Sequence, residues 1–294
     1  MSLTRRSQAV WLRVVDWFFE PVDARVHACV RIAYALTCLV ILVELWPERM
    51  AYLSDQGSLV PIAAPLVSPL AWSRSPLVVN FSLATALAAA LALLLGVAKR
   101  VSTLLLFVWH VAFMGAAYMV MSGFDMVVRL VGFVLLFAPH HDAFSLLPRR
   151  SALPEQLPSY VLRLIQFQTA VMYWATIWLK APDPYWRNGE LMAYFHMSFF
   201  ARFPTPLAAD YAGLSVIMTW SVIALEVALP LLLFGRNTRR VGIVLGLALH
   251  AGIAVTSRLS VFSLAMTPLY AAFLQGSDFD WLKSLWRKRD ATTV

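Results

Sequence analysis

Long apolar segments follow one another along most of the sequence, and they restrict the fold more than any other feature. Eight of them approach the length that a helix needs to cross a bilayer, about 17 to 25 residues, although the fourth, like the seventh, is slightly shorter. Their ranges are 26–46, 76–97, 101–121, 124–139, 159–180, 211–234, 241–256 and 259–275. Proteins in water have about a quarter of their residues charged, whereas here 60% are hydrophobic and 14% charged. We therefore predict an all-α integral membrane protein, a polytopic bundle of about eight transmembrane helices.

The segments that flank this apolar region have a different composition. Residues 1–25 mix arginines with tryptophan and phenylalanine, which is typical of an amphipathic helix lying on a membrane surface. Residues 47–75 contain several prolines, so a loop is expected there instead of a continuous helix. We expect three parts, namely an interfacial segment at 1–25, a transmembrane domain at 26–275 and a basic tail at 276–294.

The positions of the basic residues predict the orientation in the membrane. With eight spans, the segments on the side of the two termini hold 15 of the 24 lysines and arginines, and the opposite loops hold six. Because cytoplasmic loops carry the excess of basic residues, both termini are expected to be cytoplasmic, in a bacterial inner membrane. The segment 180–189 then lies on the extracytoplasmic side.

One apolar run has a polar face. Arg163, Gln166, Tyr173 and Lys180 fall within a sector of roughly 100° on a helix, and apolar residues fill the remainder. A charge that faces hydrocarbon costs at least ~2.5 kcal/mol, so this face is expected to line a protein interior or a wet cavity.

Other ionisable residues lie inside the predicted spans and have two interpretations each. Asp125 and Arg129 are four residues apart, so they either neutralise each other or contribute to a site. Glu226 precedes Pro230, whose ring bends a helix and frees a carbonyl, as is tolerated beside a cavity. His250 is either an ordinary core histidine or a neighbour of Lys180 and Glu226 in a site.

Several function classes lack support in the sequence. No basic stripe with interleaved aromatics indicates nucleic-acid binding, and no phosphate-binding loop or serine-hydrolase motif is present. His140, His141 and Asp142 are adjacent, but no metal-ligand spacing accompanies them. No metal site is predicted.

The order of motifs resembles the horizontally transferred transmembrane (HTTM) domain family, whose best-known members are the vitamin K-dependent gamma-carboxylases. The motifs are Arg31 at the start of the first span, YLSDQGSLVP at 52–61, SGFDMVVRL at 122–130, LLFAPHHDAFSL at 135–146, RLIQFQTAVMYWATIWLKAPDPYWRNG at 163–189, LEVALPLLL at 225–233, NTRR at 237–240, His250 and VFSL at 261–264. They extend over nearly the whole chain in the order of the family.

This resemblance implies a chemistry. In the carboxylases a lysine before a D-x-x-W-type segment is held to deprotonate vitamin K hydroquinone, and Lys180, six residues before Trp186, resembles that lysine. It implies catalytic roles for Lys180, Glu226 and His250, and a reduced quinone such as vitamin K hydroquinone as cofactor. A ligand cavity is expected to be lined by Arg163, Gln166, Tyr173, Trp186, Asp125, Arg129 and Arg31. The carboxylases also have a large lumenal domain, and a histidine near 122–125, that this chain lacks. Carboxylation of a client protein is therefore not expected.

Three functions follow from these observations. The first is action on a quinone, isoprenoid or lipid in an intramembrane cavity. An enzyme of this kind would be a carboxylase- or epoxidase-like lyase or would carry out quinone-dependent redox chemistry. The second is a non-catalytic membrane partner in the maturation, export or immunity of a small secreted peptide. The third is a proton-coupled transporter that uses Glu226, His250 and Asp125, although inverted repeats are not evident.

Overall fold

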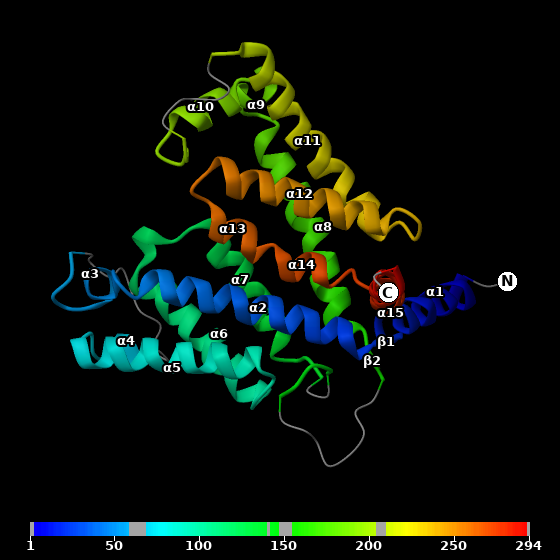
Figure 1. The fold of residues 1–294 in the computed structure, drawn as a ribbon, viewed down its shortest axis with the longest axis horizontal. Helices are drawn as coiled ribbons and strands as arrows, with labels where there is room; N and C mark the ends of the chain where they lie inside the picture. The colour runs from blue at the N-terminus through cyan, green and yellow to red at the C-terminus, as the bar shows by residue number, and fades with distance from the viewer. Residues whose placement is uncertain (1–2, 59–68, 140–141, 147–154, 204–209, 293–294) are drawn as a thin grey trace.

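The computed structural model describes residues 3–58, 69–139, 142–146, 155–203 and 210–292, and most of them are helical (Figure 1). The longer helices are α1 (Leu3–Phe19), α2 (Ala24–Leu45), α5 (Pro76–Leu94), α6 (Lys99–Ala116), α7 (Gly123–Leu135), α8 (Tyr160–Lys180), α11 (Ala212–Phe234), α12 (Arg239–Thr256) and α15 (Gly276–Thr292). Short elements connect them: β1 (Pro21–Asp23), α3 (Arg49–Leu53), α4 (Pro69–Trp72), η1 (Tyr118–Val120), β2 (Gln156–Pro158), α9 (Pro184–Asn188), α10 (Leu191–Met197), α13 (Ser260–Ala265) and α14 (Thr267–Ala271). Each predicted apolar run contains at least one helix.

Within the described ranges, four helices have the length and apolar composition of membrane spans, namely α2, α5, α11 and α12. The chain is therefore an integral membrane protein with a helical core. The helix α7 has 13 residues, which is shorter than a bilayer-spanning helix. Passage of all eight apolar runs through the membrane stays a prediction.

The last apolar run forms two short helices instead of one. The helix α13 ends at Ala265, and α14 begins at Thr267 with Pro268 in its first turn. Proline has no backbone N–H and its ring clashes with the preceding turn, so it fits the start of a helix but not its interior. The run around 259–275 is therefore a broken helix, which the expectation of one continuous helix missed.

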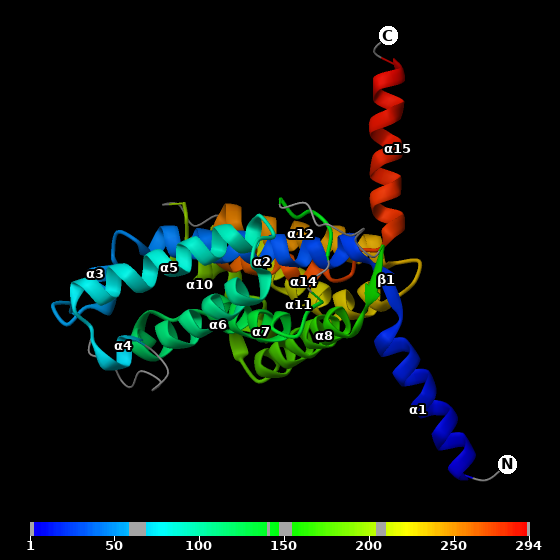
Figure 2. The same ribbon diagram turned by 90° about the horizontal axis from the view of Figure 1, so that it is seen from below.

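Both termini lie at one end of the bundle. Strands β1 and β2 pair antiparallel, with Val22 opposite Leu157, so α2 and α8 begin side by side. From this end α15 runs across the direction of α2 and α5, while α1 leaves obliquely (Figures 1 and 2). Trp11, Leu12 and Phe19 of α1 are exposed, and the position of this helix on a membrane surface stays a prediction.

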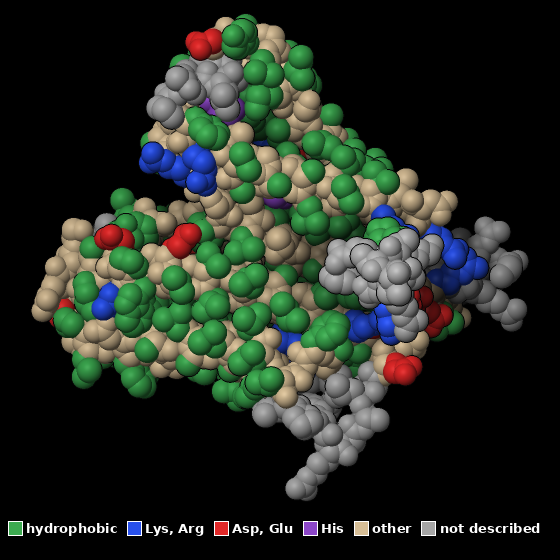
Figure 3. Space-filling view, in the orientation of Figure 1, with side chains coloured by type: hydrophobic (Ala, Val, Ile, Leu, Met, Phe, Trp, Pro, Cys, Tyr) green, Lys and Arg blue, Asp and Glu red, His purple; other side chains and the backbone are tan. Residues whose placement is uncertain are grey.

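Apolar side chains cover the middle of the visible surface, and most charged side chains lie toward its two ends (Figure 3). Inside, α2 is the central helix, and Val30, Tyr34 and Leu42 are fully buried. A Cβ on Gly132 would lie 2.4 Å from the Tyr34 hydroxyl, so only glycine lets α7 approach α2 this closely.

Ion pairs fix the first turn of α15 to the bundle. Arg239 donates to both carboxylate oxygens of Asp278, at 2.6 and 3.0 Å, and Arg240 donates to one of them at 2.7 Å. Burial by itself would raise the pKa of Asp278, but hydrogen bonds from Arg239, the Gln275 amide and Arg240 outweigh it and hold that pKa below its usual value. The predicted basic tail is thus a helix anchored at its start.

Candidate functional site

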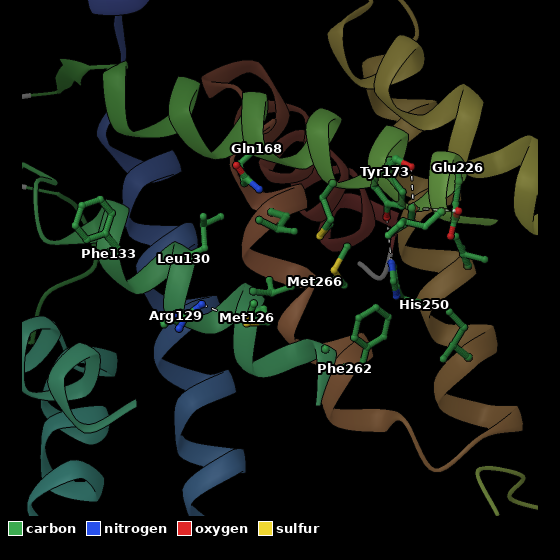
Figure 4. A pocket seen from close by; sticks show the side chains of 18 of the residues that line it. Met126, Arg129, Leu130, Phe133, Gln168, Tyr173, Glu226, His250, Phe262 and Met266 are labelled. Atoms are coloured by element: carbon green, nitrogen blue, oxygen red, sulfur yellow. Dashed lines mark hydrogen bonds between the residues drawn. The ribbon is translucent and has the colours of Figure 1, made fainter. Parts of the chain in front are cut away.

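The main cavity lies between α7, α8, α12 and the broken helix α13–α14, with Glu226 of α11 at one side (Figure 4). Its volume is about 800 Å³, within the range of about 300 to 1,000 Å³ found for ligand sites. Its lining is mainly apolar, with polar residues at a few positions: Phe107, Gly123, Met126, Val127, Arg129, Leu130, Phe133, Gln168, Met172, Tyr173, Thr176, Leu179, Glu226, Leu249, His250, Ile253, Phe262, Met266 and Leu269.

A buried hydrogen-bond network forms one wall of this cavity. The Tyr173 hydroxyl lies 3.1 Å from Nε2 of His250 and also bonds the Tyr270 hydroxyl. All three side chains are buried. Gly246, one helical turn before His250, makes room for the Tyr270 ring, because a Cβ there would lie 2.2 Å from Cε1 of that ring. Nδ1 of His250 is buried without a hydrogen-bond partner among the described residues.

Lys180 and Glu226 form an ion pair next to this network. Nζ of Lys180 lies 2.5 Å from both carboxylate oxygens, and the Thr176 hydroxyl donates to Glu226 at 3.3 Å. Glu226 lines the main cavity, whereas Lys180 lines a neighbouring cavity of about 220 Å³. The site residues predicted as catalytic therefore lie close together, with Lys180 connected to the main cavity through Glu226.

Trp186 is held over the lysine by a short capped helix. Asp183 accepts hydrogen bonds from the Tyr185 and Trp186 amides, at 2.8 and 3.4 Å, and so caps α9. The Lys180 ammonium then lies 4.3 Å from the centre of the Trp186 ring, which is a cation–π contact. Trp186 thus contacts the predicted lysine but lines the smaller cavity.

The structure places Arg163 and Gln166 away from the main cavity, which corrects the prediction of a single polar face lining one cavity. Seventeen residues of helix separate Arg163 from Lys180, which corresponds to about 26 Å. Arg163 pairs with Glu20 at 2.8 Å, and Gln166 donates to the Ala272 carbonyl at 2.7 Å. Both line a separate cleft of about 850 Å³ at the end of the molecule where the termini lie.

Asp125 and Arg129 do not pair with each other in the described part of the chain. Asp125 accepts the Ser122 amide at 2.8 Å in a capping box, and its other oxygen lies 3.3 Å from Nε2 of His110. It lines a different cavity, of about 210 Å³, beside Glu44. Arg129 lines the main cavity. The Asp125 carboxylate is thus held by the cap and by His110, and not by the Arg129 guanidinium.

Arg31 is a buried clamp and does not line the main cavity. Its guanidinium lies 2.9 Å from the Asp142 carboxylate, which also binds Lys99. It donates as well to the carbonyls of Leu94, Ala143 and Phe144, at 3.0 to 3.1 Å, so it joins α2 to the α5–α6 turn and to the segment 142–146. A charge buried in this way needs such partners to offset the loss of hydration.

Sequence reasoning missed several residues of the site. Thr176 follows Tyr173 by three residues and precedes Lys180 by four, so it borders the predicted polar face, and helical spacing could have identified it. Gln168 lies off that face, and Tyr270 belongs to the last apolar run, where nothing distinguishes it from a core tyrosine. His140 and His141 lie outside the described residues. Among the residues described, no cluster of three His, Cys, Asp or Glu side chains could hold a metal ion.

A core of apolar helices with buried ion pairs and an apolar cavity is typical of a polytopic helical integral membrane protein. Comparison with known families matches residues 19–281 to the HTTM domain, and the chain belongs to the HTTM family. This domain is linked to vitamin K-dependent carboxylase-like membrane proteins. No curated protein and no solved structure matches the chain.

Proposed function

We propose that the protein binds a lipid-soluble ligand of the quinone or isoprenoid class in the main cavity. One observation carries this proposal. The cavity lining is mainly apolar, but the hydrogen-bonding groups of Tyr173, Glu226 and His250 gather on one side of it. Apolar pockets with a few placed polar groups are typical of cofactor and ligand sites. The ring oxygen of such a ligand would bind at that side, and its chain would lie along the apolar walls.

A reduced quinone fits these residues. Nδ1 of His250 is a buried polar atom without a partner among the described residues, and a ligand hydroxyl would satisfy it. A bound hydroquinone supplies the electrons and the acidic hydroxyls for a redox reaction. Tyr173 and His250 would orient the hydroxyl, and the Lys180–Glu226 pair would accept and return its proton.

The opening of the cavity supports entry from the bilayer. Three of its lining side chains are exposed by half or more, namely Met126, Phe133 and Leu179, so the cavity is open at these residues. Such apolar side chains at a cavity mouth suit a ligand that partitions into lipid.

For the membrane topology we propose that all eight apolar runs cross a bacterial inner membrane with both termini cytoplasmic. The excess of basic residues on the side of the termini and the position of both termini at one end of the bundle support it. In Cys29→Ser/Cys38→Ser protein, a membrane-impermeant maleimide is expected to label Asp55→Cys in intact spheroplasts and Ser284→Cys only after permeabilisation. Labelling of Ser284→Cys in intact spheroplasts would contradict this orientation.

The ligand proposal is tested by mass spectrometry of quinones, isoprenoids and peptides that co-purify with the full chain in detergent. The wild type is expected to retain a quinone or isoprenoid. Tyr173→Phe should reduce that retention about 2- to 10-fold, the equivalent of one hydrogen bond of about 0.5 to 1.5 kcal/mol. Tyr211→Phe, at an exposed tyrosine outside the cavity, is the matched control.

The role of Lys180 has its own readout in the same preparation. Oxidation of added vitamin K hydroquinone under oxygen is expected to exceed the protein-free rate with the wild type and to fall to that rate with Lys180→Met. A wild type that retains a peptide and no quinone or isoprenoid would replace this proposal with the non-catalytic peptide partner. Proton-coupled uptake into vesicles that needs Glu226 would replace it with the transporter.

A further inference from the structure

Arg129 is a charged side chain in the main cavity without a carboxylate partner. It is half-buried on α7, and its guanidinium donates at 3.3 Å to the sulfur of Met126, a weak acceptor. Among the described residues it makes no ion pair. This distinguishes it from Arg31, Arg163 and Arg239, each of which has a carboxylate within 3 Å.

A second polar side chain of the cavity lacks a partner as well. Gln168 of α8 makes no hydrogen bond to any described residue, although it lines the cavity. Arg129 and Gln168 lie on the α7–α8 side of the view, away from His250 and Glu226, and Met266 and Phe262 lie between the two groups (Figure 4). The cavity therefore has two polar regions, one built around the network of Tyr173 and His250 and one where Arg129 and Gln168 have donors without an oxygen acceptor among the described residues.

Hydrogen-bond donors without an oxygen acceptor in an apolar cavity indicate which chemical group a bound ligand should carry. A guanidinium within a membrane is costly unless an anion or a strong acceptor compensates it. Its planar donors match carboxylate and phosphate oxygens in a bidentate arrangement. An anion is directed to Arg129 and not to the opposite wall, because the cation next to that wall, Lys180, is already paired with Glu226.

We infer that the ligand of the main cavity is an amphipathic acid, whose carboxylate or phosphate binds Arg129 and whose chain lies along the apolar walls. Gln168 donates a further hydrogen bond to the same group. This inference rests on the proposed function and adds an acidic group to the quinone or isoprenoid ligand, on the side of the cavity away from His250 and Glu226. Arg129 is accordingly the residue that makes the cavity prefer an acidic ligand to a neutral one.

Matched pairs of probes test the inference in full-length protein in phosphatidylcholine nanodiscs. Farnesyl phosphate is compared with farnesol, and farnesoic acid with its methyl ester, by equilibrium binding of the tritiated probes. The wild type is expected to bind each acid about 10-fold more tightly than its neutral partner, the usual scale of a charge-assisted bidentate contact. Arg129→Gln should remove this preference and leave farnesol binding within about 2-fold, because one charge-assisted contact is lost and the apolar contacts remain.

Two further variants sharpen the outcome. Arg129→Lys should keep part of the preference, and Arg163→Gln, which removes an arginine outside the cavity, should keep all of it. Equal binding of acid and neutral partner by the wild type, or a preference that survives Arg129→Gln, would overturn the inference while leaving the proposed ligand cavity intact. Failure of every probe to bind would contradict both. The preference of farnesyl phosphate over farnesoic acid, or the reverse, identifies the acidic group.

Discussion

Asp142→Ala is expected to lower the free energy of unfolding by about 3 to 5 kcal/mol, the usual cost of removing one member of a buried ion pair. The Arg31, Asp142 and Lys99 side chains are 4%, 4% and 8% exposed. Asp142 is the carboxylate that the two cations share, so its removal leaves two buried cations without this carboxylate. Thermal unfolding in detergent, followed by tryptophan fluorescence, measures the loss.

The controls for this substitution separate charge from shape. Asp142→Asn keeps the size of the side chain but removes its charge, so it is expected to lower stability substantially as well. Asp55→Ala removes an exposed carboxylate near the opposite end of the bundle and should leave the unfolding temperature unchanged. An Asp142→Asn protein as stable as the wild type would show that the carboxylate charge is not what stabilises this cluster.

Gly246→Ala is expected to disrupt the hydrogen-bond network of Tyr173, His250 and Tyr270, which forms one wall of the main cavity. The added Cβ would lie 2.2 to 2.6 Å from the Cε1, Cζ and hydroxyl atoms of Tyr270, and that ring is buried. Overpacking of this kind costs about 1 to 3 kcal/mol. Because the ring must move, its hydrogen bond to Tyr173 is lost, and binding of farnesol or of a co-purified ligand should weaken about 10-fold or more.

Gly252→Ala is the matched control for this prediction. Gly252 lies on the same helix, and a Cβ there meets no atom within 4 Å. Alanine also has the better helix propensity, so this variant should bind ligand normally and be as stable as the wild type or slightly more so. Equal effects of the two substitutions would show that α12 responds to added volume in general and not to the contact with Tyr270.

Local features of the sequence determined the helices and part of the site. The apolar runs correspond to helices because every backbone polar group must be paired inside a membrane, and a helix pairs them within one segment. The spacing of Tyr173 and Lys180 placed both on one face of α8, and the short distance from Lys180 to Trp186 in the sequence brought them into contact through the capped α9. The break in the last run was missed, although Pro268 is a residue that could have predicted it.

Only the tertiary structure decided which polar residues meet. Lys180 pairs with Glu226 across 46 residues, Tyr173 meets His250 across 77, and Arg31 meets Asp142 across 111. Helices with similar apolar surfaces do not specify their neighbours by composition, because lipid chains are as apolar as leucine and close packing determines the pairs. Asp125 and Arg129 are one turn apart in the sequence but line different cavities, and only the tertiary structure shows that Arg129 makes no ion pair among the described residues.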